Sequence, residues 1–173
     1  PAGRVATCLV RGWQAARPSD ALTLMPMSDG GPGSSQVIAP ERIASREVIQ
    51  AQGPLGQVCE VDLVRMVPSP SNPGGRRPGE GGTWFLDAAR LLAVPPDPDE
   101  AAQEALRGST HGLGQVIDVA VDRMAPSDTL LVGLSRSAVH DGGAGALDAL
   151  GGASAAAGLL AGRSIGLVLA DDI

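Results

Sequence analysis

The segment from Gly133 to Gly151, which reads GLSRSAVHDGGAGALDALG, constrains the fold more than any other part of the chain. It follows an apolar run, Thr129 to Leu134, that is typical of a buried strand, and it leads into a short Ala- and Leu-rich run that favours a helix. A strand, a glycine-rich turn and a helix in this order direct backbone N–H groups toward an anion. The segment therefore predicts an α/β unit with a candidate anion site, although many α/β proteins use such glycines only to turn the chain.

Helices and apolar strands alternate over the rest of the sequence. The predicted helices span residues 1–17, the short stretch after Asp87 through Leu92, and residues 97–107, 112–124 and 153–161. The predicted strands span residues 21–27, 46–52, 58–67, 83–86, 129–134 and 164–170, and residues 34–45 are expected to make one or two helical turns cut at Pro40. The alternation predicts an α/β fold, a mixed sheet with flanking helices.

The composition of the 173 residues is that of one globular domain, since 43% of them are hydrophobic and 18% are charged. A net charge of −6 and an aromatic content of 2% argue against nucleic acid and anionic membranes as partners. No signal peptide or membrane span is visible, which favours a cytoplasmic location. Cys8 and Cys59 match no zinc or redox spacing, so they are expected to be reduced thiols in the core.

All 13 basic residues are arginine. A phosphate clamp in this chain must therefore use arginine or a metal ion, because no lysine ammonium group is present. Arg76 and Arg77 lie in the Pro- and Gly-rich stretch 68–82, which is predicted to be a flexible loop. They either meet a phosphate or form a solvated loop tip, and the loop tip is the commoner case.

Three further motifs accompany the glycine-rich segment. They are SDGGPGS at Ser28–Ser34, GPLG at Gly53–Gly56 and THGLGQVI at Thr110–Ile117. Together the four motifs resemble, in order, the N-terminal half of the bacterial glycerate kinase family. The resemblance implies a two-domain α/β enzyme that transfers the γ-phosphoryl group of ATP to glycerate with the help of Mg²⁺. It also implies that residues 1–45 belong to a first lobe and residues 46–173 to a second lobe that carries the glycine-rich loop.

The resemblance further implies which residues act. Its catalytic candidates are Asp29, His140 and Asp141, and either aspartate would orient the substrate hydroxyl or hold Mg²⁺. The candidates for binding substrate or phosphate are Gly30, Gly31, Thr110, Ser137, Gly142 and Gly143. No metal site made of side chains alone is predicted, because the two histidines lack neighbouring ligands.

Several of these residues also have a purely structural interpretation. The Asp29 motif is typical of a tight turn, Thr110 is a natural N-cap for the following helix, and an exposed histidine beside a turn, as at His140, is common. Asp87 follows a predicted strand, where it either matches an acidic residue of the family or is a buried capping group. The sequence leaves these alternatives open.

The glycine-rich loop departs from the family pattern, since Ser135-Arg136-Ser137 replaces Gly-Gly-Ser and His140 replaces Asn. The Arg136 guanidinium would either fill the space that a phosphate approaches or bind that phosphate. The family also has a strand and a lysine-containing loop ahead of the first helix, and a large C-terminal portion, so a truncated member is expected. An alternative function is therefore a non-catalytic or repurposed relative, such as an accessory protein of a biosynthetic pathway, that binds a small anionic molecule or a partner chain.

The final predicted strand, residues 164–170, is nearly all apolar, as expected of a strand that is covered on both faces. In a full-length relative the second domain would provide such a cover. A homodimer or a complex with a complementary chain is therefore expected, with this strand or the first helix near the contact. Alternatively, the helices at 153–161 and 1–17 bury the strand themselves.

Overall fold

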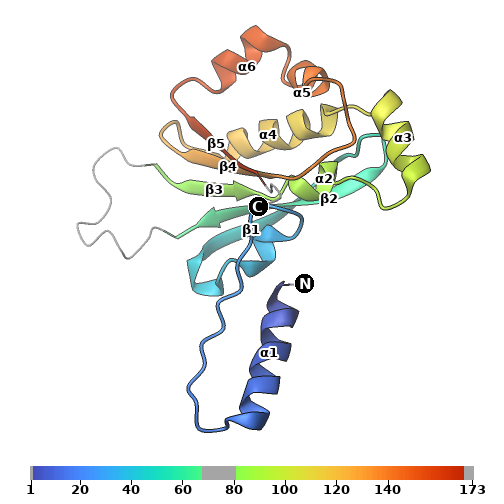
Figure 1. Cartoon of the computed structure of the whole chain (residues 1–173). Helices are drawn as coiled ribbons and strands as arrows, with labels where there is room; N and C mark the ends of the chain where they lie inside the picture. Colours follow the sequence, from blue (N-terminus) through green and yellow to red (C-terminus); the bar gives the residue numbers. More distant parts are fainter. Residues whose placement is uncertain (1, 68–80, 170–173) are drawn as a thin grey trace.

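The computed structural model describes residues 2–67 and 81–169 and shows one mixed five-stranded sheet (Figure 1). The strands are β1 (Ile43–Gln52), β2 (Val58–Met66), β3 (Thr83–Leu86), β4 (Thr129–Leu134) and β5 (Ser164–Leu169), and they lie side by side in this order. The pairs β1–β2 and β2–β3 are antiparallel, whereas β3–β4 and β4–β5 are parallel. The predicted α/β fold with a mixed sheet is confirmed.

Helices cover one face of this sheet. The helices are α1 (Ala2–Ala16), α2 (Ala89–Leu92), α3 (Pro98–Arg107), α4 (His111–Arg123), α5 (Ala144–Ala149) and α6 (Ala153–Leu159), and the 3₁₀ turns η1 (Ser34–Val37) and η2 (Pro40–Arg42) precede β1. Figure 1 shows α4, α5 and α6 above the sheet and the segment with η1 and η2 below it. No helix in the described ranges is long and apolar enough to cross a membrane.

The hydrophobic core lies between the sheet and α4. The apolar face predicted for α4 is confirmed, since Val116 and Ala120 are fully buried and Leu113 and Ile117 pack partly against the core. The alternation predicted for β2 holds in its middle, where Val61 and Leu63 are buried while Glu60 is exposed and Asp62 half-buried. It weakens at the ends, because Cys59 is only half-buried and Val64, on the face of Glu60, is buried. The core is mainly aliphatic, as a sequence with so few aromatic residues requires, and Trp84 is its one aromatic member among the described residues.

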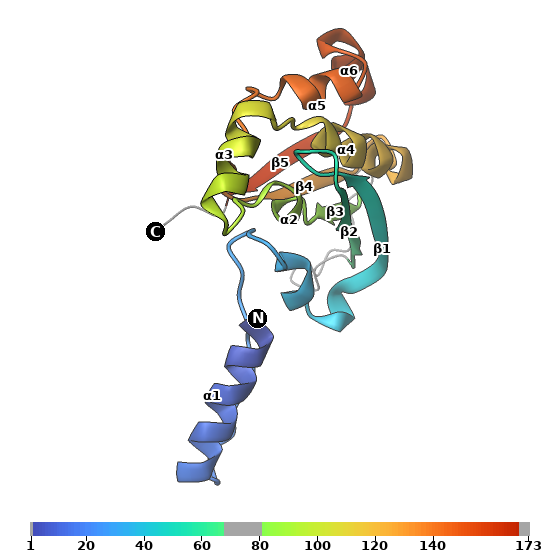
Figure 2. The same ribbon diagram turned by 90° about the vertical axis from the view of Figure 1, so that its right-hand side faces the viewer.

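Helix α1 forms where the sequence predicts it but stands away from the sheet (Figure 2). No residue of α1 is buried. The chain then returns to the sheet without forming the strand predicted at residues 21–27, and that prediction is wrong. An apolar run becomes a strand only where another strand offers its hydrogen-bonding edge, and this segment runs beside α1, with Leu24 and Met25 exposed.

The expectation that both cysteines lie in the core is wrong for Cys8, and the predicted loop and lobe boundary are not tested. Cys8 is a free thiol exposed on α1, not a core residue, because α1 has no core to face; Cys59 is free and half-buried. Residues 68–80, with Arg76 and Arg77, lie outside the described residues, so the predicted loop stays a prediction. The division of the chain into two lobes at residue 45 also stays a prediction.

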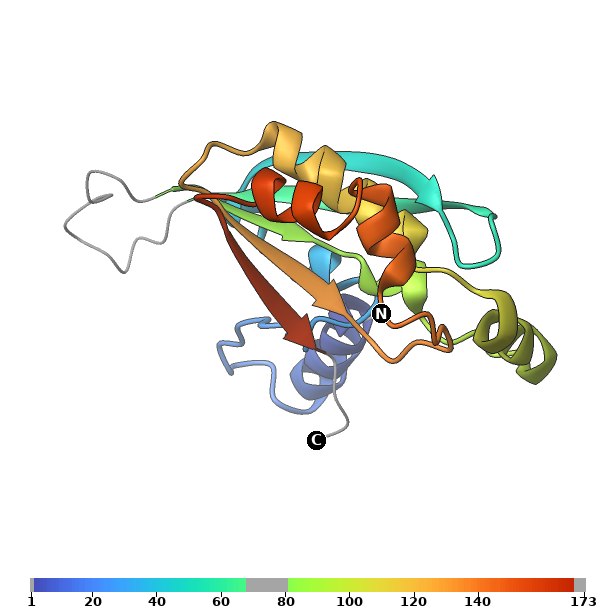
Figure 3. The ribbon, with the colours of Figure 1, turned by 90° about the horizontal axis from the view of Figure 1, so that it is seen from above.

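Strand β5 forms one edge of the sheet, beside β4 (Figure 3). Its residues Ile165, Leu167 and Leu169 pair in register with the inward-facing Leu130, Val132 and Leu134 of β4. Leu167 and Leu169 are nevertheless exposed. Neither α6 nor α1 covers them, so the alternative in which these helices bury the strand is wrong.

Candidate functional site

The four sequence motifs lie around one edge of the sheet, the edge at which β1, β3, β4 and β5 end. GPLG connects β1 to β2 there, the glycine-rich loop follows β4, and the loop Ser28–Ser34 lies against β4 and β5. In open α/β sheets, ligands bind outside the carboxyl ends of the parallel strands. This edge is therefore the candidate functional site.

Gly30 seats the loop Ser28–Ser34 on the sheet. A Cβ atom added at Gly30 would lie 2.6 Å from Cγ1 of Val168 on β5, and its φ of 103° is one that other residues rarely adopt. The carbonyl oxygen of Gly30 would lie 2.8 Å from a Cβ atom added at Gly133 on β4. Glycines at both positions thus allow the loop to approach the ends of two parallel strands.

The Asp29 carboxylate closes its own turn and remains exposed. Its Oδ1 accepts a hydrogen bond from the N–H of Gly31 at 2.9 Å, and the Ser34 hydroxyl donates to the Gly31 carbonyl oxygen at 2.5 Å. The hydroxyls of Ser28 and Ser34 also pair with each other. The tight-turn interpretation is therefore correct for the backbone, and the carboxylate faces outward from that turn.

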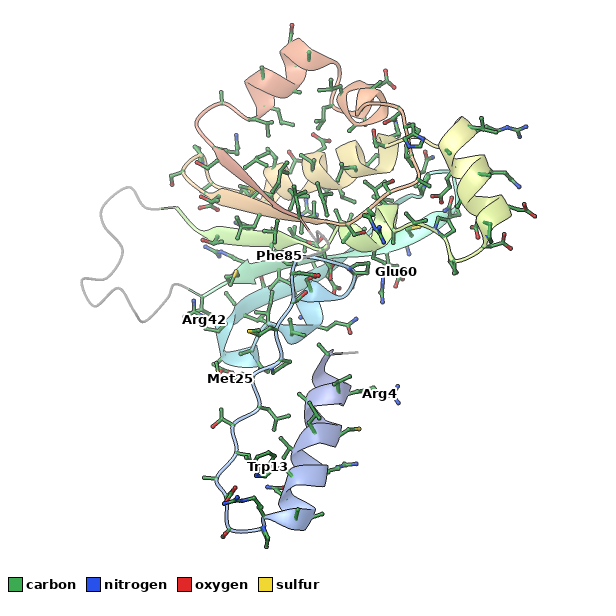
Figure 4. All side chains as sticks on the ribbon, in the orientation of Figure 1. Arg4, Trp13, Met25, Arg42, Glu60 and Phe85 are labelled. Carbon is green, nitrogen blue, oxygen red and sulfur yellow. The ribbon has the colours of Figure 1, made fainter. Side chains whose placement is uncertain are left out.

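A cleft of about 830 Å³ lies between this loop and the start of α1. Its walls come from Ala2, Gly3, Arg4, Met27, Ser28, Asp29, Pro32, Gly33, Gln36 and Val37. Figure 4 shows the side chain of Arg4 projecting from the first turn of α1. Arg4 and Asp29 thus bring charges of opposite sign to one cleft, large enough for a small metabolite.

Asp87 follows β3 and is buried beneath the same loop. Its Oδ2 accepts a hydrogen bond from the N–H of Ser35 in η1 at 3.0 Å, whereas α2, which follows Asp87, has no side-chain cap. The buried position is therefore confirmed, but Asp87 binds a distant turn and does not cap the helix that follows it. Its Oδ1 is buried without a hydrogen-bond partner among the described residues. An unpaired buried carboxylate oxygen is costly, which makes Asp87 a second candidate beside Asp29.

Sequence reasoning missed the polar residues that hold Asp87 and η1 together. The Ser35 hydroxyl donates to Oδ2 of Asp62 at 2.6 Å, and Arg46 donates to the Ser35 carbonyl oxygen at 2.7 Å. Asp62 points away from the core on β2, which the strand alternation did indicate. That position alone looked like an ordinary exposed carboxylate, because the covering by η1 depends on a contact between distant segments.

The carboxylate of Asp141 joins the glycine-rich loop to the starts of α4 and α5. Its Oδ2 accepts hydrogen bonds from the N–H groups of Thr110 at 2.7 Å and Gly145 at 3.1 Å, and its Oδ1 accepts one from Gly143 at 2.9 Å. Burial by itself raises the pKa of Asp141, but these bonds and the Thr110 hydroxyl together lower that pKa below its ordinary value. Asp141 is thus held as a charged group.

Thr110 occupies the N-cap position of α4, as predicted, but its hydroxyl caps a different helix. The hydroxyl makes no capping hydrogen bond within α4. It lies 2.9 Å and 3.0 Å from the two Asp141 oxygens, and it accepts a hydrogen bond from the N–H of Ala146 in α5 at 3.0 Å. Thr110 therefore binds α4, α5 and the loop to one another.

Close glycine contacts explain the GPLG and THGLGQVI motifs. A Cβ atom at Gly112 would lie 1.7 Å from the carbonyl oxygen of Gln52, and one at Gly114 would lie 2.3 Å from that of Ala146. The N–H of Ser109 donates to the carbonyl oxygen of Pro54 at 3.0 Å. These motifs fix the start of α4 against the β1–β2 turn and α5, and so they place Thr110.

Gly142 and Gly143 present an open backbone surface. Their φ angles are 64° and 82°, and a Cβ atom at either would meet no atom within 4 Å. The N–H of Gly143 already donates to Asp141, whereas the N–H of Gly142 donates to no acceptor in the described ranges. Of the two, Gly142 has the donor that is available to a ligand.

The other residues of the glycine-rich loop lie near its outer surface. His140 and Arg136 are exposed and Ser137 is half-buried, with its hydroxyl accepting a hydrogen bond from the N–H of Val139 at 3.1 Å. Whether Arg136 blocks or binds a phosphate, and whether His140 is catalytic, stay predictions.

The described residues contain no group of three or more His, Cys, Asp or Glu side chains that would hold a metal ion. Mg²⁺ in phosphoryl-transfer enzymes is commonly held by one or two carboxylates together with substrate phosphates. The exposed Asp29, which lines the cleft, is a carboxylate that fits this donor set, whereas the buried Asp87 does not line the cleft. The donor set does not fit Asp141, because protein donors already bind both of its oxygens.

Comparisons with known proteins agree with this arrangement. The model of the glycerate kinase family matches residues 1–161. An uncharacterised protein of Mycobacterium tuberculosis is 32% identical over 173 residues, which cover 97% of this chain and 40% of the relative. A glycerate kinase of Bacillus subtilis is 31% identical over 151 residues, which cover 85% of this chain and 35% of the relative.

A solved structure of a relative has a similar fold over most of this chain. The crystal structure of a putative glycerate kinase 2 from Salmonella typhimurium matches with a TM-score of 0.53 and 26% identity, over 85% of this chain and 36% of that one. The chain thus spans 35–40% of the length of these relatives. Because the family match contains all four motifs and both Asp-Gly-Gly turns, the chain belongs to the glycerate kinase family.

Proposed function

We propose that this chain supplies one side of a glycerate kinase active site and takes part in the transfer of a phosphoryl group from ATP to glycerate. The observation that carries the proposal is the exposed carboxylate of Asp29 beside a cleft of about 830 Å³, at the carboxyl edge of the sheet. The family match supports the reaction class. A cytoplasmic location stays a prediction.

The roles of the residues follow from their hydrogen bonds. Asp29 is proposed to orient the glycerate hydroxyl or to hold Mg²⁺, which when bound would neutralise charge on the phosphates. The free N–H of Gly142 is proposed to donate to an anionic oxygen of the substrate or ATP. Gly30 and Gly31 shape the loop around Asp29, while contact of Ser137, Gly143 or His140 with substrate stays a prediction.

Asp141 and Thr110 are proposed as positioning residues. The Asp141 carboxylate is bound by N–H groups from both sides of the loop, so it holds Gly142 in place without an oxygen left for the substrate. Phosphoryl transfer depends mainly on position and charge stabilisation, so losing this support should reduce turnover indirectly.

The direct test is incubation of the protein with ATP, Mg²⁺ and D-glycerate, with phosphoglycerate measured by ³¹P NMR. Asp29→Asn should remove turnover, because the neutral amide lacks the charge proposed to hold Mg²⁺ and binds the substrate hydroxyl more weakly. Asp97→Asn is the matched control, since Asp97 is an exposed capping residue of α3 and asparagine also caps helices. Turnover that survives Asp29→Asn would refute the role of Asp29, and no turnover in the folded wild-type chain would refute activity of this chain alone.

A non-catalytic relative that binds a small anionic molecule is the second candidate. It is favoured by Arg136, an exposed residue of the same glycine-rich loop that contains the open Gly142. Calorimetric titration with ATP, with and without Mg²⁺, separates the two functions. Binding that requires Mg²⁺ supports the kinase, whereas metal-independent binding of anions that is lost in Arg136→Gln supports the second candidate.

A further inference from the structure

Ser35, in η1, is held by residues of β1, of β2 and of the end of β3. Its N–H donates to Oδ2 of Asp87, after β3, at 3.0 Å, and its hydroxyl donates to Oδ2 of Asp62 on β2 at 2.6 Å. Its carbonyl oxygen accepts a hydrogen bond from Arg46 on β1 at 2.7 Å. The N–H, the hydroxyl and the carbonyl group of Ser35 therefore each have a partner, and the residue is completely buried.

Ser35 is directly connected to the loop that carries Asp29. The neighbouring Ser34 donates its N–H and its hydroxyl to the carbonyl oxygen of Gly31, at 3.1 Å and 2.5 Å. Gly31 in turn donates its N–H to Oδ1 of Asp29 at 2.9 Å. Because one short hydrogen-bonded turn joins these residues, a displacement of Ser35 would also displace the Asp29 carboxylate.

The chain on the other side of this loop gives it little support. Residues 20–29 form neither helix nor strand, and the apolar side chains at 24, 25 and 27 are exposed. The contact of Gly30 with β5 is a packing contact, whereas the hydrogen bonds of Ser35 are directional. The position of the loop on the sheet thus depends mainly on Ser35 and its partners.

Asp87 is the most enclosed of the three partners. It has an exposed fraction of 4%, whereas the side chains of Arg46 and Asp62 are 36% and 23% exposed. Water can replace a half-exposed partner at small cost, but a buried N–H that loses its acceptor costs the full desolvation of that group. Of the three hydrogen bonds, the one between Ser35 and Asp87 is therefore the one whose loss should displace the loop most.

We propose that Asp87 is a positioning residue, which through Ser35 sets where the Asp29 carboxylate lies at the carboxyl edge of the sheet. Asp87 does not line the cleft, so this role involves no contact with substrate or Mg²⁺. A displacement of about 1 Å in a reacting group can reduce turnover by about 100-fold, so such support matters for phosphoryl transfer. The inference rests on the proposed function of Asp29, but the position of the loop is measurable without turnover.

The unpaired Oδ1 of Asp87 allows position to be separated from charge. No described residue donates a hydrogen bond to Oδ1. Asp87→Asn can therefore direct its oxygen toward Ser35 and place its NH₂ group where Oδ1 lies, without facing another donor there. The proposed role requires an acceptor for the N–H of Ser35 and no negative charge, so asparagine should preserve the position of the loop.

The test compares Asp87→Ala with Asp87→Asn by NMR and by amide hydrogen exchange. Asp87→Ala should shift the amide signals of Gly30 and Gly31 and speed exchange of the Gly31 N–H by about tenfold, the factor expected for one lost hydrogen bond. Asp87→Asn should leave both close to wild type. Asp128→Ala is the matched control, because Asp128 is a buried acceptor, 5% exposed, at the opposite end of the sheet. It should lower the melting temperature without changing either readout.

Three results would overturn the proposal. The first is a folded Asp87→Ala variant with unchanged Gly31 exchange, and the second is an equal change in Asp128→Ala, since the effect would then be general destabilisation. The third is a change in Asp87→Asn as large as in Asp87→Ala, since charge would then matter and not the acceptor.

A second variant covers the case in which Asp87→Ala does not fold. Asp62→Ala removes the acceptor of the Ser35 hydroxyl and should change the same amide signals to a smaller extent, and no change there would count against the proposal. Where the wild-type chain is active, Asp87→Ala should lower kcat and leave the KM for ATP unchanged. A folded wild-type chain without turnover would count only against the proposed function, because the loop position is measured independently.

Discussion

The tripeptide Asp-Gly-Gly occurs twice in this chain, and its two copies make the same local hydrogen bond in opposite surroundings. In each copy Oδ1 of the aspartate accepts the N–H of the second glycine at 2.9 Å. Asp141 is then bound by further donors from α4 and α5, whereas Asp29 is exposed. The first glycines of the two copies differ in the opposite sense. Gly30, beside the exposed Asp29, lies in close contact with Val168, whereas Gly142, beside the tightly bound Asp141, faces open space.

This difference shows that the tripeptide defines a turn and not a role. A carboxylate surrounded by N–H donors supports structure, and an exposed one is available for chemistry. A glycine in contact permits packing, and an open one permits the approach of a ligand. The roles of the two loops therefore depend on segments that are distant in sequence.

The sharpest test of the comparison is to remove each aspartate. Asp141→Ala should lower the free energy of unfolding by about 3 kcal/mol, because it leaves several buried or half-buried donors without an acceptor. Asp29→Ala should change it by about 0.5 kcal/mol or less, as for other exposed residues. Urea denaturation followed by circular dichroism measures both values.

Asp128 is a useful control for this experiment. It accepts hydrogen bonds from Trp84 and Ala125 and from the N–H of Gly82, at the opposite end of the sheet. Asp128→Ala should therefore destabilise the fold about as much as Asp141→Ala without touching the candidate site. Equal losses for Asp29→Ala and Asp141→Ala would contradict the contrast between the loops.

The glycines should respond in the opposite order. Gly30→Ala places a methyl group 2.6 Å from Val168 at a positive φ, so we expect a loss of about 2–3 kcal/mol. Gly142→Ala has open space and carries only the cost of its φ, about 1 kcal/mol. Thermal unfolding of the two variants measures the difference, and a larger loss for Gly142→Ala would be incompatible with the contacts described.

Much of the fold was predictable because its signals are local. The apolar stripe of α4, the alternation in the middle of β2 and the Asp97 cap of α3 depend on neighbours a few residues away, and each is confirmed. The strand predicted at residues 21–27 failed for the opposite reason. Its apolar residues satisfy the pattern, but no strand in the described ranges offers them an edge.

The sequence identified which residues belong to the candidate site, but not which of them contact each other. The motifs indicated that Asp29, Thr110 and Asp141 matter, but not that Thr110 and Asp141 bind each other across 31 residues of sequence. The Ser35–Asp62 hydrogen bond joins residues 27 apart and has no motif at all. Such roles depend on which segments the tertiary fold brings together.

Substitutions at Thr110 test how much its hydroxyl, which contacts Asp141, contributes to the free energy of unfolding. Thr110→Val keeps the shape of the side chain but removes the hydroxyl that contacts Asp141 and accepts the N–H of Ala146, so a loss of about 1–1.5 kcal/mol is expected. Thr110→Ser keeps the hydroxyl and should lose less. Urea denaturation of both variants is the measurement, and equal losses would show that the methyl group matters and the hydroxyl does not.

The smallest expected effect is in the pH dependence of stability. Burial raises the pKa of Asp141, but the hydrogen bonds from Thr110, Gly143 and Gly145 outweigh it, so the folded-state pKa lies below the ordinary value of 3.8. The stability that Asp141 contributes is therefore fully present above that value and is lost as the pH falls through the folded-state pKa. Asp141→Asn should flatten the decline of the unfolding free energy below about pH 5. The flattening is partial, because the pKa of Asp128 is also lowered and Asp128 remains in this variant. Urea denaturation at a series of pH values decides this, and the same decline in wild type and Asp141→Asn would show that the donors around Asp141 do not favour its charged form.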